Sequence, residues 1–151
     1  MDENDGRVIS NFVKQVKNHS EITIYGDGSQ TRSFCHVSDM VNGLISLADN
    51  NVSGPINLGN PDEYTILEVA KLICEIWDYP TDNIVYRELP VDDPNRRKPN
   101  IDKAILLLDW KPKVSLKEGL LLIKKWKNTV YYNMNSFTLV KVFFLVMLLP
   151  V

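Results

Sequence analysis

Apolar residues recur at the spacing of an α-helix in several stretches of the chain. The clearest is 5–18, where one apolar face emerges and the lysines fall elsewhere. A second helix is expected over 38–48, with Ser38 or Asp39 as its cap. The side of this second helix that we expect to be buried consists of Met40, Val41, Leu44, Ile45 and Ala48.

Two further helices are indicated by capping boxes at their first turns. In a capping box a hydroxyl accepts a hydrogen bond from the backbone at the helix start, while a carboxylate three residues later reaches back. Thr65 with Glu68 has this spacing, and so does Ser115 with Glu118. Helices are therefore expected over 65–77 and 115–127, with a shorter one over 101–108.

Short strands are expected between the helices. The β-branched run 22–25 and the segment 31–37 predict a pair of strands joined by a glycine turn. Further strands are expected over 55–59 and 84–86. Helices that alternate with short strands in one small unit indicate an α/β or α+β domain, and we take α/β as the fold class.

The stretch from Tyr25 to Asp39 organises the chain around a turn and an arginine. Gly26–Gly28 tolerates positive φ and allows a sharp turn. Arg32 follows on the next strand, and its planar fork of donors matches two phosphate oxygens at once. The alternative is a surface arginine paired with Asp27 or Asp39, which these residues alone favour.

A polar loop later in the chain carries three consecutive cations, Arg96, Arg97 and Lys98. Such a cluster is suited to an anion. The alternative is a solvated loop in which the arginines pair with Asp92 and Asp93.

Composition narrows the class of protein. The chain has 151 residues, 44% of them hydrophobic and 24% charged, with a net charge of −2, which is ordinary for one globular domain. No basic cluster is interleaved with aromatics, so nucleic acid is not expected as a partner. Cys35 and Cys74 have no metal-like spacing and are expected to be buried free thiols. The histidines, His19 and His36, are too few for zinc or triad chemistry, and His36 is expected on a strand.

The two ends of the chain differ from its body. Residues 1–6 are acidic and lack the basic start and apolar core of a signal peptide. Residues 137–151 are nearly all apolar, but they contain Lys141 and fall short of the roughly 20 residues of a membrane span. We expect two parts, a domain at 1–128 and a hydrophobic tail at 129–151.

Two motifs of dinucleotide enzymes are missing from the sequence. The glycines, at positions 6, 26, 28, 43, 54, 59 and 119, do not have the spacing of a dinucleotide-binding loop. No tyrosine is followed four residues later by a lysine, the cation that would lower the pKa of a tyrosine base. The sequence therefore contains no complete catalytic constellation.

Several segments occur in an order typical of one family. In chain order they are Asp5-Gly-Arg-Val-Ile-Ser-Asn-Phe12, Tyr25-Gly-Asp-Gly-Ser-Gln-Thr-Arg-Ser-Phe34, Val37-Ser-Asp-Met-Val-Asn-Gly-Leu44, Pro55-Ile-Asn-Leu-Gly-Asn-Pro61, Asp92-Asp-Pro-x-x-Arg-Lys-Pro99 and Asp109-Trp-Lys-Pro112. On these segments the chain resembles the C-terminal part of the UDP-glucuronate decarboxylases (UDP-xylose synthases), which are extended short-chain dehydrogenases/reductases. The resemblance covers about residues 4 to 127.

The resemblance implies an enzyme that oxidises UDP-glucuronate at C4 with tightly held NAD, loses CO₂ and reduces the 4-keto pentose to UDP-xylose. It also implies that the NAD-binding Rossmann half and a Tyr-x-x-x-Lys pair belong to a part this chain lacks, so we expect a fragment without catalytic residues. A homodimer and a Golgi lumenal location, anchored by a span upstream, are implied too. A cytoplasmic form is the alternative location.

The resemblance also implies roles for individual residues. Arg32 falls on the arginine that reaches the diphosphate, and Arg97 on the arginine beside the same nucleotide. The strand ending at Tyr25 would flank the uracil. The other residues expected to bind substrate are Arg7, Val8 and Gln30.

The sequence departs from the family at two positions. Asn100 stands where the family usually has Asp and can still cap a helix. Asp109 stands where the family often turns with glycine, which strains the turn.

Two hypotheses compete with the interpretation of the chain as an enzyme fragment. One is a non-catalytic module that binds UDP-sugars or pairs with full-length subunits, and the other is an inert fragment with an exposed apolar patch.

Overall fold

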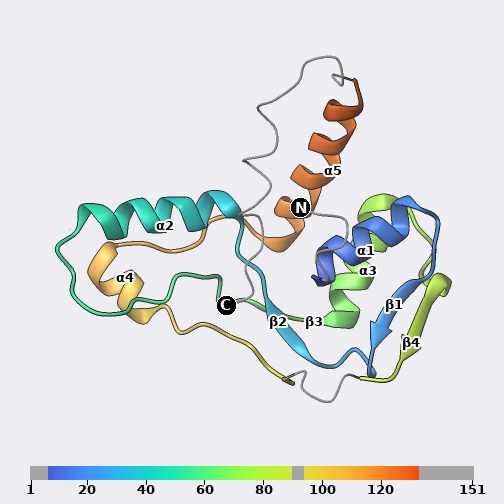
Figure 1. The fold of residues 1–151 in the computed structure, drawn as a ribbon, viewed down its shortest axis with the longest axis horizontal. Coiled ribbons are helices and arrows are strands. Elements are labelled where there is room, and N and C mark those ends of the chain that lie inside the picture. Colours follow the sequence, from blue (N-terminus) through green and yellow to red (C-terminus); the bar gives the residue numbers. More distant parts are fainter. Residues whose placement is uncertain (1–6, 90–93, 133–151) are drawn as a thin grey trace.

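The computed structural model describes residues 7–89 and 94–132, with side chains as far as residue 125. Helices and strands are interspersed along the chain, which confirms the α/β class (Figure 1). The helices are α1 (Val8–Lys17), α2 (Val37–Asp49), α3 (Ile66–Trp77), α4 (Asp102–Leu108) and α5 (Leu116–Tyr132). The strands are β1 (Ile22–Tyr25), β2 (Thr31–Ser33), β3 (Glu63–Thr65) and β4 (Ile84–Arg87). A short 3₁₀-helix, η1 (Thr81–Asn83), precedes β4.

The strands form two small sheets, each of two strands. β1 pairs in parallel with β4, from Ile22 opposite Ile84 to Tyr25 opposite Arg87. β2 pairs antiparallel with β3. The two strands that flank the glycine turn therefore do not pair with each other, because the turn directs β2 toward a second sheet. Gly26 and Gly28 do have positive φ, +72° and +78°, as the sequence predicts.

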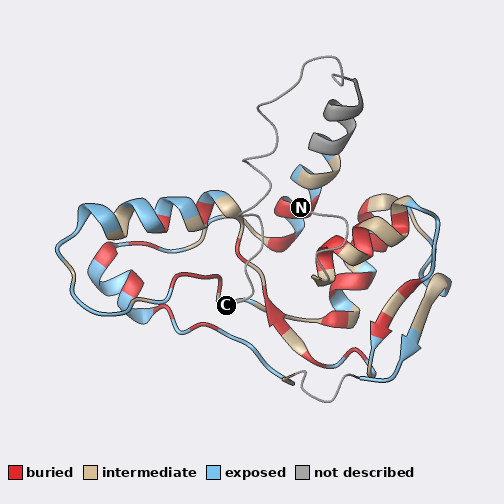
Figure 2. Cartoon of the chain, viewed as in Figure 1, coloured by how far each residue is buried: buried red, intermediate tan, exposed pale blue. Residues whose placement is uncertain are grey.

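The larger hydrophobic cluster lies where α1, α3 and α5 meet β1. Helix α1 packs on α3, and α3 packs on α5, so apolar faces close on one another from several sides. Figure 2 shows this part of the chain as its most deeply buried. The buried members of the cluster are Ile9, Phe12, Val13, Val16, Ile22, Ile24, Ile66, Val69, Ala70, Ile73, Cys74, Ile76, Leu116 and Leu120.

Helices α2 and α4 form an arm on the other side of β2 (Figure 1). Their cluster contains fewer buried residues: Cys35, Leu58, Ile101, Ala104, Leu108 and Trp110.

The expected buried side of α2 is wrong. Val41, Leu44 and Ile45 are 40%, 50% and 54% exposed, Ala48 is exposed, and Met40 is only partly buried. The buried residues of α2 are Asp39 and Gly43. The helix has a wider apolar stripe than α4 covers, so most of the stripe remains at the surface of the arm.

The helix starts confirm the local predictions in two of three cases. The capping boxes of Thr65 with Glu68 and of Ser115 with Glu118 are both formed. Helix α2 is different, because it begins at Val37 and its cap is His36, whose Nδ1 accepts from the amide of Ser38. The extended segment consequently stops at Ser33, and the prediction of His36 on a strand is wrong.

The strand expected over 55–59 is not formed, and β3 was not expected. A strand needs a neighbour to complete its ladder, and the described residues provide none for 55–59. Residues 63–65 find that neighbour in β2. Helix α5 extends to Tyr132, five residues beyond its predicted end, and residues 133–151 of the predicted tail lie outside the described residues.

Of the two departures from the family, Asp109 behaves as expected, whereas Asn100 is not the N-cap of α4, because Ile101 occupies that position and makes no side-chain cap hydrogen bond. The Asn100 side chain accepts from the amide of Asp102, the first residue of α4, at 2.9 Å. Asp109 ends α4 in the left-handed region, with φ +47°. Glycine adopts this region at lower cost than an L side chain.

Candidate functional site

The candidate site is built around β2, which has an extended neighbour on each side. Strand β3 pairs along one edge, with Arg32 opposite Tyr64. On the other edge Thr31 forms a parallel bridge with Arg96, and the Thr31 amide donates to the Asn95 carbonyl at 2.9 Å. Strand β2 thus becomes the centre of three extended segments that come from distant parts of the sequence.

Arg32 lies on this central strand and is only 8% exposed. Its Nη1 donates to the Thr31 carbonyl at 2.8 Å. The two carboxylates that the sequence offered as partners have other hydrogen bonds: Asp27 accepts from the amide and hydroxyl of Ser29, and Asp39 accepts from the amides of Lys113 and Val114. A buried guanidinium is expensive to desolvate and is suited to an anionic ligand.

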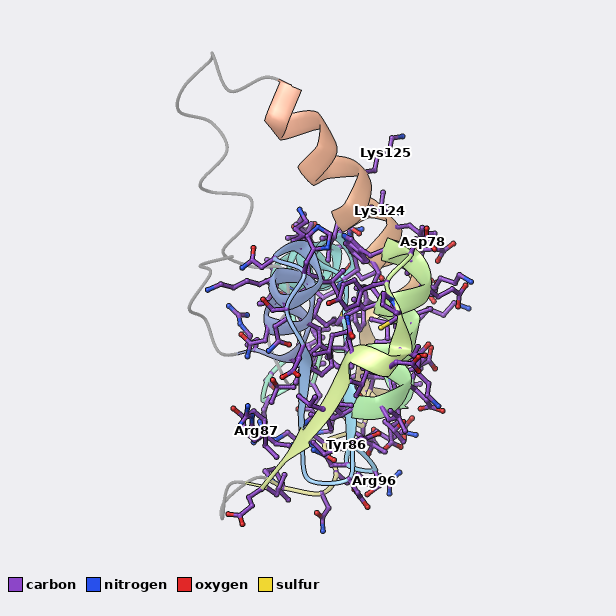
Figure 3. All side chains as sticks on the ribbon, turned by 90° about the vertical axis from the view of Figure 1, so that its right-hand side faces the viewer. Asp78, Tyr86, Arg87, Arg96, Lys124 and Lys125 are labelled. Atoms are coloured by element: carbon purple, nitrogen blue, oxygen red, sulfur yellow. The ribbon has the colours of Figure 1, made fainter. Side chains whose placement is uncertain are left out.

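Glu63, on β3, connects the loop that contains Arg96 and Lys98 to β2. Its carboxylate accepts from Arg96 Nε and Nη2, both at 2.7 Å, and from Thr31 Oγ1 at 3.0 Å. Lys98 Nζ lies 3.3 Å from the same carboxylate. The hydrogen bond from Arg96 is the main reason that the pKa of Glu63 is lowered to about 2. Figure 3 shows Arg96 at the same end of the molecule as Tyr86 and Arg87, far from Lys124 and Lys125.

Gln30 and Tyr25 are joined to each other. The Gln30 side chain is 8% exposed, and its Nε2 donates to the Tyr25 carbonyl at 2.6 Å. The Gln30 carbonyl in turn accepts from the amide of Ile66. Gln30 therefore braces the glycine turn against α3, while the Tyr25 side chain remains 48% exposed at the end of β1.

The remaining predicted residues are placed less closely. Arg97 follows the bridge residue Arg96 and is exposed. Arg7 is half-buried at the position before α1, and Val8 packs against the larger cluster, as Phe34 does after β2. The structure thus places Arg32 on β2 with Gln30 just before it, sets Arg97 directly after the residue bridged to β2, and leaves Arg7 and Val8 at the start of α1. The proposed partners Asp92 and Asp93 lie outside the described residues.

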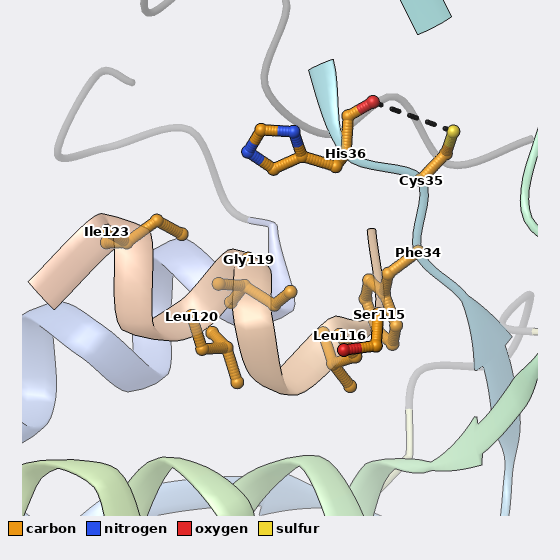
Figure 4. Close-up of a pocket in the computed structure, with 9 residues that line it drawn as sticks. Phe34, Cys35, His36, Ser115, Leu116, Gly119, Leu120 and Ile123 are labelled. Carbon is orange, nitrogen blue, oxygen red and sulfur yellow. Dashed lines mark hydrogen bonds between the residues drawn. The ribbon is translucent and has the colours of Figure 1, made fainter. Parts of the chain in front are cut away.

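A small cavity lies between α5 and the segment after β2 (Figure 4). It measures about 20 Å³, which suits about one water molecule and excludes a nucleotide. Burial lowers the pKa of His36 and raises the pKa of the Cys35 thiol to about 11. A thiol with that pKa stays protonated near neutral pH. Both cysteines are free and buried, as predicted.

Two other kinds of site are absent from the described part of the chain. No cluster of three or more His, Cys, Asp or Glu residues there is arranged to hold a metal ion. No helix there has the length and apolar character needed to cross a membrane.

Several known proteins are similar in sequence to this chain. Residues 1–59 match the NAD dependent epimerase/dehydratase family. The chain is 52% identical over 128 residues to UDP-glucuronic acid decarboxylase 2 of Arabidopsis thaliana, and 54% identical over 117 residues to UDP-glucuronic acid decarboxylase 1 of Danio rerio. The first 59 residues are thus similar to that family, and the relatives matched over most of the chain are UDP-glucuronic acid decarboxylases. These matches cover 84% and 78% of the chain but only 28% of each relative.

A solved structure of the epimerase/dehydratase type has the same fold in the matched part. The UDP-glucuronic acid 4-epimerase of Bacillus cereus, in complex with UDP-glucuronic acid and NAD, is 25% identical and superposes with a TM-score of 0.76. The match covers 83% of this chain and 41% of that one. The chain therefore corresponds to a part of the full-length family fold.

The family name implies NAD, and the residues described here do not fit its binding loop. Gly26 and Gly28 form the turn between two strands, and Gly43 and Gly119 lie inside helices. None of them opens a helix directly after a strand, which is where a dinucleotide loop cradles the phosphates. Any NAD of the family would be held by other residues.

The sequence did not identify Glu63, whose carboxylate accepts hydrogen bonds from Thr31 on β2 and from Arg96 in the polar loop. No local signal identifies it, because its partners Thr31 and Arg96 are 32 and 33 residues away. An unexplained carboxylate near a predicted helix start was the only available hint.

Proposed function

We propose that this chain is part of a UDP-glucuronate decarboxylase and supplies the nucleotide-sugar side of its pocket. The proposed reaction converts UDP-glucuronate to UDP-xylose and CO₂, with NAD reduced and reoxidised within one cycle. The names of the two relatives support this activity. The observation that carries the proposal is the three-stranded arrangement around β2, which brings a buried arginine and a neighbouring basic segment together.

In this proposal the chain holds the substrate and the chemistry takes place elsewhere. Arg32 and Arg97 bind the diphosphate, each through charge-assisted hydrogen bonds of the kind that contribute about 1.5–3 kcal/mol. Tyr25 flanks the uracil, and Gln30 fixes the turn that presents it. Arg7 and Val8 border the pocket at the start of α1.

NAD and the Tyr-x-x-x-Lys pair would come from the portion of the family fold that these residues do not form. NAD supplies hydride removal and return at the sugar C4, and the present residues only orient the nucleotide. The full enzyme is proposed to be a homodimer in the Golgi lumen, held by a membrane span outside this chain, or alternatively a cytoplasmic protein.

One observation favours a second function, a subunit-pairing module without catalysis. The apolar stripe of α2 is exposed, and exposed apolar patches often mark interaction surfaces. The native size of the protein separates the two functions, because a module would be found at the 17.3 kDa of this chain and the enzyme at a much larger mass. An immunoblot of source tissue measures it.

The affinity of the 151-residue chain for UDP, measured by isothermal titration calorimetry, tests the proposed pocket. We expect Arg32→Ala to weaken UDP binding by about tenfold or more, because it removes a charge-assisted contact. Arg87→Ala is the matched control, since Arg87 is also a strand arginine but is exposed on β4. Equal affinity of the Arg32→Ala variant and the unchanged chain would contradict the assignment.

A further inference from the structure

The three extended segments around β2 place their side chains on two faces. Successive residues of a strand point to opposite faces, and residues paired across a ladder share a face. Glu63 is opposite Ser33, which shares a face with Thr31 two residues before it. Thr31 is bridged to Arg96. Thr31, Glu63 and Arg96 therefore belong to one face, and their hydrogen bonds agree with that.

The other face belongs to Arg32. Its ladder partner on β3 is Tyr64. On the opposite edge, Arg97 follows the Thr31–Arg96 bridge, which is isolated and does not continue into a ladder. The bridge therefore brings Arg97 to within one residue of a contact with β2, the strand that carries Arg32.

Glu63 also divides the cations of the loop. Arg96 directs its Nε and Nη2 at the two oxygens of Glu63, so its fork of donors is occupied by a carboxylate. Lys98 shares the same carboxylate. Arg97 stands between them, and in the described part of the chain no ion pair engages it.

We propose that Glu63 is a positioning residue of the anion site: its pairing with Arg96 holds residues 95 and 96 beside β2, so that the next residue, Arg97, meets a diphosphate together with Arg32. This role rests on the proposed function, because it requires that a nucleoside diphosphate bind there. Glu63 carries the same charge as the ligand and acts on it through Arg96.

Glu63→Gln tests the role, since it removes the charge and keeps the size of the side chain. Its matched control is Glu75→Gln, because Glu75 forms a comparable ion pair with Lys117 at 2.8 Å on the exposed surface of α3 and α5. Two quantities are measured in the 151-residue chain: the exchange rate of the Thr31 amide hydrogen, which bonds to Asn95, and the affinities for UDP and for uridine.

We expect Glu63→Gln to accelerate Thr31 amide exchange, to weaken UDP binding by about tenfold and to leave uridine binding within about twofold. Glu75→Gln should change none of these. A merely structural role would weaken UDP and uridine equally and would overturn the proposal. Unchanged exchange, or tighter UDP binding through released Arg96 and Lys98, would overturn it as well.

The outcome is distinguishable from failure of the proposed function. If the unchanged chain binds no UDP, the nucleotide site is wrong and the positioning role falls with it. If the unchanged chain binds UDP and Arg32→Ala abolishes binding, but Glu63→Gln binds UDP normally, the site stands and only the role of Glu63 is wrong.

Discussion

The larger cluster and the α2–α4 arm use similar amphipathic helices with different results. In the larger cluster, Ile22, Ile24 and Ile73 have no exposed surface, because helices α1, α3 and α5 enclose them with β1. In the arm, Leu44 and Ile45 of α2 are about half exposed. Figure 2 shows the contrast as a mostly buried region on one side and a mostly exposed helix on the other.

The difference shows that an apolar stripe in the sequence predicts a helix face that can be buried, but does not predict which element covers it. Helix α3 finds partners in α1 and α5. Helix α2 meets α4 and the Trp110 side chain along a narrower strip, where Trp110 Nε1 donates to the Asp39 carbonyl at 3.0 Å. The arm is accordingly held by a smaller apolar cluster and by side chains such as Trp110 that lie directly against the α2 backbone.

The largest effect that would sharpen this contrast is expected for truncation in the larger cluster. Ile73→Ala removes a fully buried side chain and should lower the free energy of unfolding by about 2–5 kcal/mol. Leu44→Ala, in the arm, should lower it by about 1 kcal/mol or less, because the side chain is half exposed. Urea denaturation measures both. Equal losses would mean that the α2 stripe is covered in solution.

A smaller effect is expected from two helix glycines. A Cβ at Gly43 would lie 2.9 Å from Trp110 Cε2 and 3.1 Å from Leu58. Overpacking costs about 1–3 kcal/mol and outweighs the gain in helix propensity of about 1 kcal/mol. Gly43→Ala should therefore destabilise the chain. At Gly119 the nearest atom is His36 Cδ2 at 3.4 Å, so Gly119→Ala should stabilise it by about 0.5–1 kcal/mol.

Thermal and urea unfolding of both alanine variants gives the signs directly. Opposite signs support close backbone packing as the basis of the arm. Stabilisation by both substitutions would show that α2 can move away from Trp110 without loss.

The smallest effect concerns pH. Burial lowers the pKa of His36 below its ordinary value, although Asp39 opposes the shift. The folded chain therefore binds a proton less readily than the unfolded chain. The contribution of His36 to stability is complete above about pH 6.5 and is lost as the pH falls below it. Protonation would also remove the acceptor that caps α2 at the Ser38 amide.

His36→Asn provides the control, since asparagine caps a helix without titrating in this range. Unfolding free energies measured from pH 8 to pH 5 should fall less steeply for the variant than for the unchanged chain. The same slope in both proteins would rule out a contribution from His36.

Sequence predicted best what depends on neighbours in the chain. Both capping boxes and the positive φ of Gly26 and Gly28 were predictable, because each involves residues within about three positions. The partner of β2 was not, because nothing in Thr31–Ser33 states which distant segment completes its ladder. The strand expected over 55–59 failed for the same reason.

The candidate site divides in a similar way. Resemblance to a family selected Arg32 and Arg97, but it did not identify Glu63, whose pairing with Arg96 depends on tertiary structure. Gln30 was predicted to bind substrate, and its described contacts are with the backbone of the glycine turn. The sequence therefore did not show which neighbour the buried Gln30 side chain would bind.

The assembly of the site from 31–33, 63–65 and 95–96 has a consequence for the order of folding. Pairing 31–33 with 63–65 closes a loop of about 30 residues, and adding 95–96 beside β2 then closes a second loop of about 30 residues between 65 and 95; each closure costs about 3 kcal/mol of chain entropy. The capped helices require no such closure. The helices of the larger cluster should therefore form early, and the three extended segments should associate late in folding. A ligand bound across them would slow unfolding by holding together the parts that separate first.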